Sequence, residues 1–213
     1  MKKAGLYIAL IVIGLLMFCL NHVGRSLGDE IFYSLGISPW TGPDQTGFHL
    51  SVILGLILLF VGISKTAKYY RPKYPKILSL LIIASIGFIS VYPIMTENML
   101  FLIKRNSHTI ASIDYLNKDS QCNYQSDEGK IRANCSVTLY NYGPEKEVSI
   151  RPILDGHLAD FDFEPTALII APHTKDMYTI DFYSQQSTDS GTWGSTGPIG
   201  IEIELDGMKK LYE

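Results

Sequence analysis

The first hundred residues alternate between long apolar runs and short polar segments. Three runs contain no Asp, Glu, Lys or Arg, and they lie at about 4–20, 48–64 and 77–95. As a helix, residues 77–95 would be about 28 Å long, which is close to the hydrocarbon thickness of about 30 Å. The pattern therefore predicts three transmembrane helices within a membrane anchor of residues 1–105.

The third run has an irregular end. Pro93 lacks an N–H and cannot bond the Ile89 carbonyl, which predicts a kink near that end of the helix. Residues 99–103 are apolar again after a short polar break. Two continuations remain open: a helix that extends toward residue 103 as a stalk, or a short separate segment at the membrane interface.

The first run could also be a signal peptide. A cleavage site needs small residues, whereas Met17, Phe18 and Leu20 are bulky. Phe18 also precedes Cys19 at a position where a lipoprotein signal needs a small residue. We therefore expect residues 4–20 to be a retained span.

Two local features are predicted inside the anchor. Leu27–Leu35 has the composition of a short interfacial helix, with Ser26 as its N-cap and acidic residues in its first turn. In the second run, Ser51 and Gly55 are small residues four positions apart. This spacing permits close packing against the adjacent span.

Beyond residue 105 the pattern changes to an alternation of apolar and polar positions. Such alternation is typical of half-buried strands, and it recurs in several segments separated by Gly, Pro, Asn and Asp turns. The apolar faces are Ile131/Ala133/Cys135/Val137/Leu139, Val148/Ile150, Phe161/Phe163, Tyr178/Ile180/Phe182 and Ile199/Ile201/Ile203/Leu205. We predict an immunoglobulin-like antiparallel β-sandwich over residues 106–213, in which Ile201 and Ile203 are buried and Glu202 and Glu204 face solvent.

Charge divides the chain in the same place. Residues 1–105 carry ten Lys/Arg and four Asp/Glu, a balance of +6, and residues 106–213 carry eight and seventeen, a balance of −9. An acidic half argues against a nucleic-acid partner. The lipid bilayer is the expected partner of the basic, apolar half.

The basic residues also predict topology. Lys2, Lys3 and five cations within 65–76 would lie on one side of the membrane, against Arg25, Lys104 and Arg105 on the other. By the positive-inside rule, the N-terminus is then cytoplasmic and residues 106–213 are outside the plasma membrane.

Two cysteines of the outer region flank a predicted turn. Cys122 and Cys135 lie on either side of Asp127–Gly129 and could face each other across a hairpin. A disulfide is chemically allowed outside the cytoplasm, and we favour it over two reduced, packed thiols. Neither cysteine has the partners of a zinc site.

Three further sets of residues are candidates for binding. Asp160, Asp162 and Glu164 alternate along one segment and could hold Ca²⁺, although a solvated strand face is the simpler interpretation. Trp193 and Ser195 belong to a glycine-rich stretch that could contact a partner, although we expect Trp193 to fold onto the sandwich. His22, His49 and Glu97 form a polar cluster at the predicted membrane edge, where solvation by headgroups is the default.

No stretch carries a specific catalytic motif, so we predict no catalytic residues and no cofactor. The expected function is a non-catalytic interaction, sensing or accessory module, whose partner could be a membrane or envelope protein. One alternative is a metal-dependent envelope enzyme at the membrane edge that uses His22, His49 and Glu97. Another is an accessory subunit of a transporter complex.

Overall fold

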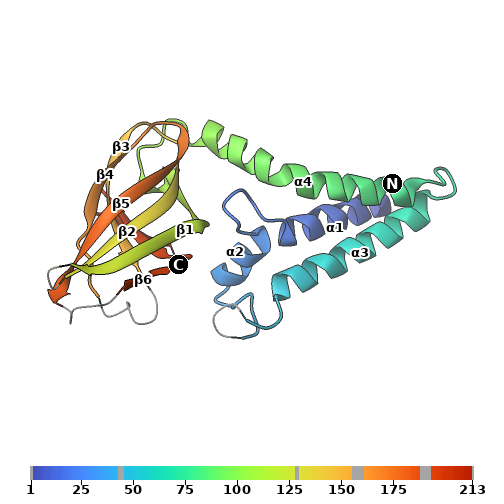
Figure 1. The fold of residues 1–213 in the computed structure, drawn as a ribbon. Helices are drawn as coiled ribbons and strands as arrows, with labels where there is room; N and C mark the ends of the chain where they lie inside the picture. The colour runs from blue at the N-terminus through green and yellow to red at the C-terminus, as the bar shows by residue number, and fades with distance from the viewer. Residues whose placement is uncertain (1, 43–45, 128–129, 155–160, 188–192, 213) are drawn as a thin grey trace. The chain divides into compact units, whose positions relative to one another are not determined.

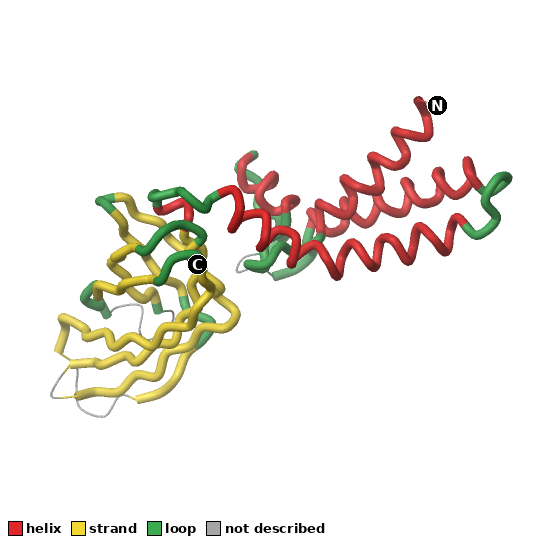
Figure 2. The backbone as a smooth tube through the Cα atoms, turned by 90° about the horizontal axis from the view of Figure 1, so that it is seen from above, coloured by secondary structure: helices red, strands yellow, loops and turns green. Residues whose placement is uncertain are grey.

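The computed structural model describes residues 2–42, 46–127, 130–154, 161–187 and 193–212. The chain divides into two compact units, Met1–Asn98 and Met99–Glu213. Helices make up most of the first unit and strands most of the second (Figures 1 and 2). The boundary falls inside one continuous helix. The fold alone does not assign the first unit as a membrane anchor or the second as an outer domain, and both assignments stay predictions.

The described residues form four α-helices: α1 (Lys2–Phe18), α2 (Leu27–Ser34), α3 (Leu50–Tyr70) and α4 (Ile77–Ile103). By length and composition, α3 and α4 are able to cross a membrane, whereas α1 is apolar but shorter, at 17 residues. α3 continues past its apolar run through Lys65 and Lys68, which are good helix formers, and ends before Pro72.

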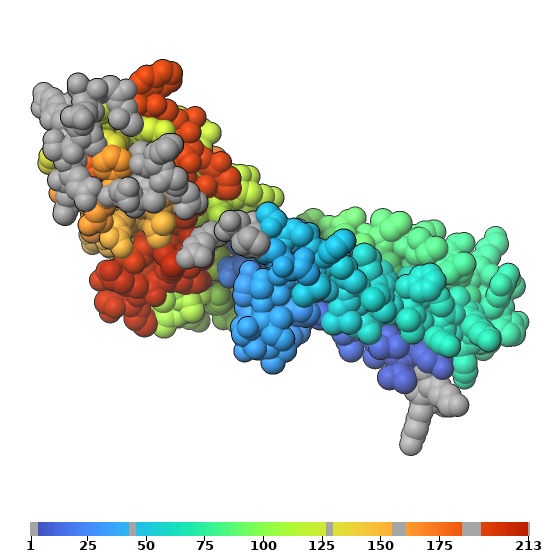
Figure 3. Space-filling view, turned by 90° about the horizontal axis from the view of Figure 1, so that it is seen from below, coloured from blue at the N-terminus to red at the C-terminus, as the bar shows by residue number. Residues whose placement is uncertain are grey.

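Small residues form the contact between α1 and α3. The buried residues of α3 are Ser51, Gly55, Gly62 and Thr66. A Cβ atom on Gly55 would lie 2.9 Å from the carbonyl oxygen of Gly14, and a Cβ on Gly14 would lie 2.7 Å from the backbone nitrogen of Leu59. The predicted close packing at Ser51 and Gly55 is therefore confirmed. Figure 3 shows α1 in dark blue, α3 in teal and α4 in green within this unit.

Two local predictions in the helical unit can be compared with the structure. Ser26 caps α2, and its side-chain oxygen accepts a hydrogen bond from the backbone N–H of Asp29, as predicted. α4 contains Pro93 and continues to Ile103, so residues 99–103 extend this helix and do not form a separate segment. Thr96 stabilises the turn after Pro93 by donating its hydroxyl to the Pro93 carbonyl at 2.9 Å.

The second unit contains two antiparallel four-stranded sheets, which form a sandwich-like pair (Figure 1). The first has the order β5-β2-β1-β6 and the second the order β4-β3-β7-β8. The strands are β1 (Ile113–Asp127), β2 (Lys130–Asn141), β3 (Lys146–Ile153), β4 (Thr166–Ile170), β5 (Thr174–Ser187), β6 (Trp193–Thr196), β7 (Gly200–Leu205) and β8 (Met208–Tyr212).

The alternating residues of the sequence build the core of this unit. One hydrophobic cluster includes residues of both sheets. Ile201 and Ile203 are fully buried on β7, as predicted. Two tyrosine hydroxyls are satisfied inside the unit: Tyr115 donates to the Ile199 carbonyl at 2.7 Å and Tyr212 donates to the Ile113 carbonyl at 2.6 Å. Burial raises the pKa of Tyr115 to about 12.

One predicted strand is wrong, and of one long strand only the part near Cys122 was expected, from the predicted hairpin. Phe163 is buried, but it forms only an isolated bridge with Ser184, so the Phe161/Phe163 segment is no strand. β1 has weak alternation because its pairing with β2 shifts register between Leu116 and Gln121. Within this bulge Ser120 accepts a hydrogen bond from the Ile199 N–H, which ties the irregular stretch to the second sheet.

Candidate functional site

The outer face of the β5-β2-β1-β6 sheet carries a row of large polar and aromatic side chains. The strand pairing places Tyr183 of β5 opposite Arg132 of β2, Arg132 opposite Gln125 of β1, and Gln125 opposite Trp193 of β6. Neighbouring positions on the strands, such as Ala133 and Phe182, are fully buried. Because side chains alternate along a strand, the four residues of the row point away from the core.

A second row runs beside the first. It consists of Asp181, Asn134, Asn123 and Ser195, which are again partners across four strands. Arg132 donates from Nη2 to Asp181 Oδ2 at 2.9 Å, and Asn134 donates from Nδ2 to Asp181 Oδ1 at 2.8 Å. The hydrogen bonds from Arg132 and Asn134 lower the pKa of Asp181, so its carboxylate is ionised at neutral pH.

The two rows surround a shallow hollow. Its volume is about 260 Å³, and it is lined by Asn123, Tyr124, Gln125, Arg132 and Asn134. The aromatic residues at the ends of the first row are open to solvent, with Trp193 82% exposed and Tyr183 44% exposed. We call the two rows together the polar-aromatic face. It offers aromatic surface at its edges and hydrogen-bonding groups at its centre.

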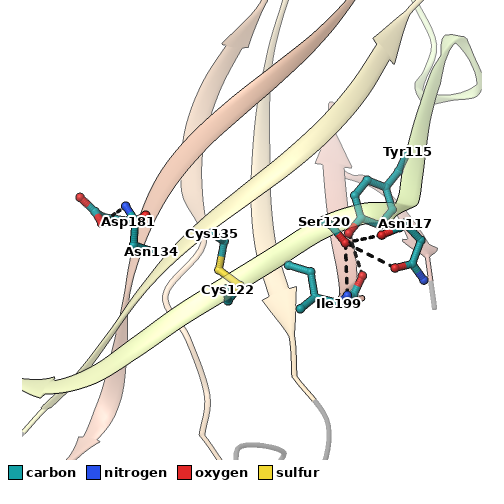
Figure 4. The surroundings of a disulfide bond; sticks show 8 residues. All are labelled: Tyr115, Asn117, Ser120, Cys122, Asn134, Cys135, Asp181 and Ile199. Carbon is teal, nitrogen blue, oxygen red and sulfur yellow. Dashed lines mark hydrogen bonds between the residues drawn. A yellow bond between two sulfur atoms is a disulfide. The ribbon is translucent and has the colours of Figure 1, made fainter. Parts of the chain in front are cut away.

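The predicted disulfide lies directly behind this face. Cys122 and Cys135 are register partners on β1 and β2, both are fully buried, and their sulfur atoms are bonded in the structure (Figure 4). Their Cα atoms are 4.0 Å apart. The adjacent residues Asn123 and Asn134 point to the opposite side of the sheet. The covalent link therefore holds the two central strands of the face in register.

The structure places both predicted partner-contact residues, Trp193 and Ser195, on the polar-aromatic face. They belong to strand β6, which pairs with the edge of β1. The expectation that Trp193 folds onto the sandwich is wrong, because its register on β6 directs it away from the core. The predicted alternation of Ile131, Ala133 and Cys135 implies that Arg132 and Asn134 lie on the polar side of β2. The sequence gave no signal that Tyr183 and Gln125 join the same row.

The carboxylate group proposed for calcium does not assemble among the described residues. Asp160 lies outside the residues that the structure describes. Asp162 accepts a hydrogen bond from Arg151 at 3.0 Å, and Glu164 is exposed. An arginine beside the carboxylate competes with a cation for the same oxygen atoms, so this segment is a poor calcium site.

The residues of the membrane-edge cluster have separate partners in the helical unit. His22 lies against Thr96, with 3.2 Å between His22 Nδ1 and Thr96 Oγ1, and Glu97 is half-buried on α4. His49 instead pairs with Asp29, and Nε2 and Oδ1 are 2.7 Å apart. Within the described ranges, no three His, Cys, Asp or Glu residues gather as metal ligands would.

A triad of Ser, His and Asp in this unit has the wrong connectivity for catalysis. Ser51 donates its hydroxyl to Asp29 Oδ1 at 2.5 Å, the same oxygen that His49 approaches, and the His49 ring stacks on Trp40 at 4.1 Å. In a catalytic triad the histidine contacts the serine and removes its proton. Here the carboxylate separates the two, and Ser51 is fully buried. The arrangement is suited to joining α2 to the start of α3.

Comparison with known proteins finds no matching family model, no matching curated protein and no matching solved structure. The functional argument therefore depends on the residues of the polar-aromatic face and of the helices.

Proposed function

We propose that this chain is a multi-pass membrane protein that presents its β unit outside the cytoplasm as a non-catalytic recognition module. The observation that supports recognition is the polar-aromatic face, where Trp193 is exposed beside polar groups held in fixed register. Tryptophan and tyrosine are enriched at recognition surfaces, where they supply a large contact area together with a polar group.

The helical unit supports the membrane part of the proposal. Large apolar side chains such as Phe60 and Ile83 are exposed on α3 and α4, and the buried positions of α3 are small. We count α1 as a third span because it packs along α3 and its outward residues Leu6, Val12 and Ile13 are apolar. This inverted pattern suits a hydrocarbon environment.

Charge and redox chemistry support the proposed orientation. The turn between α3 and α4 and the end of α3 contain Lys65, Lys68, Arg71, Lys73 and Lys76, which favour the cytoplasmic side. The Cys122–Cys135 bond suits an oxidising compartment for the β unit.

The strand order also supports the immunoglobulin-like interpretation of the β unit. β1, β2 and β5 correspond to strands A, B and E of that fold, and β4, β3, β7 and β8 correspond to C′, C, F and G. The disulfide differs, because it joins neighbouring strands of one sheet where antibody domains link B to F across the sheets. Loops and faces of such sandwiches are common sites of recognition.

Membrane-impermeant thiol labelling of intact cells tests the proposal. The background is Cys19→Ala, which removes a buried free thiol and leaves the disulfide in place. Ala167→Cys lies on an exposed position of β4, and Tyr74→Cys lies in the exposed turn between α3 and α4. We expect labelling at position 167 in intact cells and at position 74 only after the membrane is permeabilised.

The reverse labelling pattern would place the β unit in the cytoplasm and refute the proposed function. Labelling at both positions in intact cells would also contradict it. The Cys19→Ala protein without an added cysteine must stay unlabelled, because Cys122 and Cys135 are joined in the disulfide. This protein is the control.

A further inference from the structure

Two exposed aromatic residues stand at the two ends of one straight row. Tyr183, Arg132, Gln125 and Trp193 are successive register partners across β5, β2, β1 and β6. Three strand spacings of about 4.8 Å separate the ends by about 14 Å. A ligand that contacts both rings must therefore be extended, and it must cross the four strands.

The centre between the aromatic residues is polar. Within the described part of the chain, the side-chain amides of Asn123 and Gln125 have no hydrogen-bond partner, and both residues are exposed. Each amide offers two donors and one acceptor. The hollow beside them is bordered by Arg132 and Asn134, so planar amide groups, with donors and acceptors, and a donor-only guanidinium group line the path from one ring to the other.

Charges on the face are balanced. Arg132 pairs with Asp181 at 2.9 Å, and the other six residues of the two rows carry no charge. An excess of cations, which a polyanion would need, is therefore not found along these rows. The face also differs from a protein interface, whose centre is apolar and whose rim is polar.

We propose that the polar-aromatic face binds a neutral, β-linked oligosaccharide. Such a chain presents hydroxyl groups that can pair with amide and guanidinium groups. It also presents flat C–H faces that can pack on the rings of Trp193 and Tyr183. This inference depends on the proposed function, because an extracellular glycan reaches the face only if the β unit lies outside.

The sheet holds the proposed site in a fixed shape before any ligand arrives. The disulfide fixes β1 against β2, and Asp181 fixes Arg132 and Asn134 through three hydrogen bonds. Side chains that are already ordered lose less conformational entropy on binding. The amides of Asn123 and Gln125 then supply the contacts that depend on the ligand.

The test uses the full-length protein in lipid nanodiscs, without sugar-headed detergents that would compete. Oligomers of β-linked glucose and of β-linked N-acetylglucosamine are titrated by calorimetry, with oligogalacturonate as the anionic comparison. The chain has 2 tryptophans, so Trp40→Phe leaves Trp193 as the fluorescent reporter. We expect saturable binding of a neutral oligomer and a shift of the Trp193 emission.

Variants locate the binding. Trp193→Ala and Gln125→Ala should each weaken the affinity by about tenfold or more. Ile169→Ala, at a side chain 62% exposed on the second sheet, is the matched control and should leave the affinity unchanged. Thermal unfolding of each variant checks that the fold is kept, and Trp193→Phe should restore most of the affinity.

The failures can be told apart. Neutral binding that is unchanged in Trp193→Ala, or stronger binding of oligogalacturonate, overturns the proposed site or its ligand. Absence of binding to every neutral oligomer overturns the ligand class. If a photo-cross-linker at Ser195 then captures one protein in a Trp193-dependent manner, the face recognises protein and the proposed function stands. Only the thiol-labelling experiment can refute the orientation itself.

Discussion

The two units of the chain differ in how far their large apolar side chains are exposed. In the helical unit, Phe60 is 73% exposed and Ile83 67% exposed, whereas the buried positions of α3 are Ser51, Gly55, Gly62 and Thr66. In the β unit, Ile150, Ile201 and Ile203 are fully buried. Large apolar residues of α3 and α4 therefore face outward where those of the β unit face inward, while Ile11 and Leu15 of α1 are buried within the helical unit.

This difference shows which force holds each unit together. Burial of apolar area stabilises the fold of the β unit, whose large apolar residues lie in its core. The helices gain little from burying apolar side chains if lipid surrounds them, and they depend on the close approach of backbones at glycine. The β unit is also stabilised covalently, because the disulfide between Cys122 and Cys135 lies within it.

The largest expected effect comes from a charge in the apolar core of the β unit. Ile203→Asp would bury a carboxylate in the apolar core, where its register partner Lys210 is already paired with Asp114 at 3.0 Å, and we expect a loss of stability of about 4 kcal/mol or more. Ile83→Asp makes the same change at an exposed position of α4. It should leave the β unit folded and impair membrane insertion, at a cost of about 3 kcal/mol.

Limited proteolysis of the β unit and carbonate extraction of membranes measure the two outcomes separately. If Ile83→Asp unfolded the β unit, or if Ile203→Asp left it resistant to protease, the contrast between the units would be wrong.

Removal of the disulfide should have the next largest effect. Replacing both Cys122 and Cys135 by Ala opens a loop with a sequence separation of 13. The chain-entropy estimate for a loop of this size is about 3 kcal/mol. Denaturant unfolding followed by fluorescence measures the loss. Reduced wild-type protein should unfold at the same denaturant concentration as the double variant, and an unchanged midpoint in both would argue against a structural disulfide.

The glycine contact gives the corresponding test for the helices. Gly55→Leu would force a side chain against the Gly14 carbonyl, which lies 2.9 Å from the Cβ position, and overpacking of this kind costs about 2 kcal/mol. Gly87→Leu on α4 is the matched control, because nothing lies within 4 Å of its Cβ position. In nanodiscs, the thermal unfolding temperature of Gly55→Leu should be lower than that of Gly87→Leu. Equal stability would mean that α1 and α3 do not depend on this contact.

Much of the fold could be predicted because hydrophobic patterning is local. The apolar runs located α3 and α4, and strict alternation located β2 and β7. Alternation failed for β1, where the bulge between Leu116 and Gln121 shifts the register. It also suggested a strand at Phe161 and Phe163, where one buried aromatic residue fills the core from an irregular segment.

The candidate site was harder to predict because it depends on which strands are neighbours. Trp193 and Ser195 were named from composition alone, and the polar side of Arg132 and Asn134 follows from the alternation of their apolar neighbours. Tyr183 and Trp193 are at the two ends of one row only because β5 pairs with β2 and β6 pairs with β1. These pairings are long-range, and a single sequence carries no signal for them.

The smallest expected effect is at Glu202, which the sequence pattern places simply in solvent. The structure places this carboxylate between Lys209 at 3.0 Å and Arg151 at 3.3 Å, with its side chain 21% exposed. The hydrogen bond from Lys209, with support from Arg151, lowers the pKa of Glu202. Because the folded-state pKa is below the unfolded value of about 4.3, the stabilisation is present above that pH and disappears as the pH falls through the folded-state pKa.

Glu202→Gln should therefore lower stability at neutral pH by less than about 1 kcal/mol, as is usual for partly exposed pairs. Unfolding curves of wild type and variant should converge in acid. Glu204→Gln is the control, since Glu204 is more exposed and lies 3.5 Å from Lys209, and its effect should be smaller. A difference between Glu202→Gln and wild type that persisted at the lowest pH would show that packing of the side chain, and not its charge, stabilises this edge of the sheet.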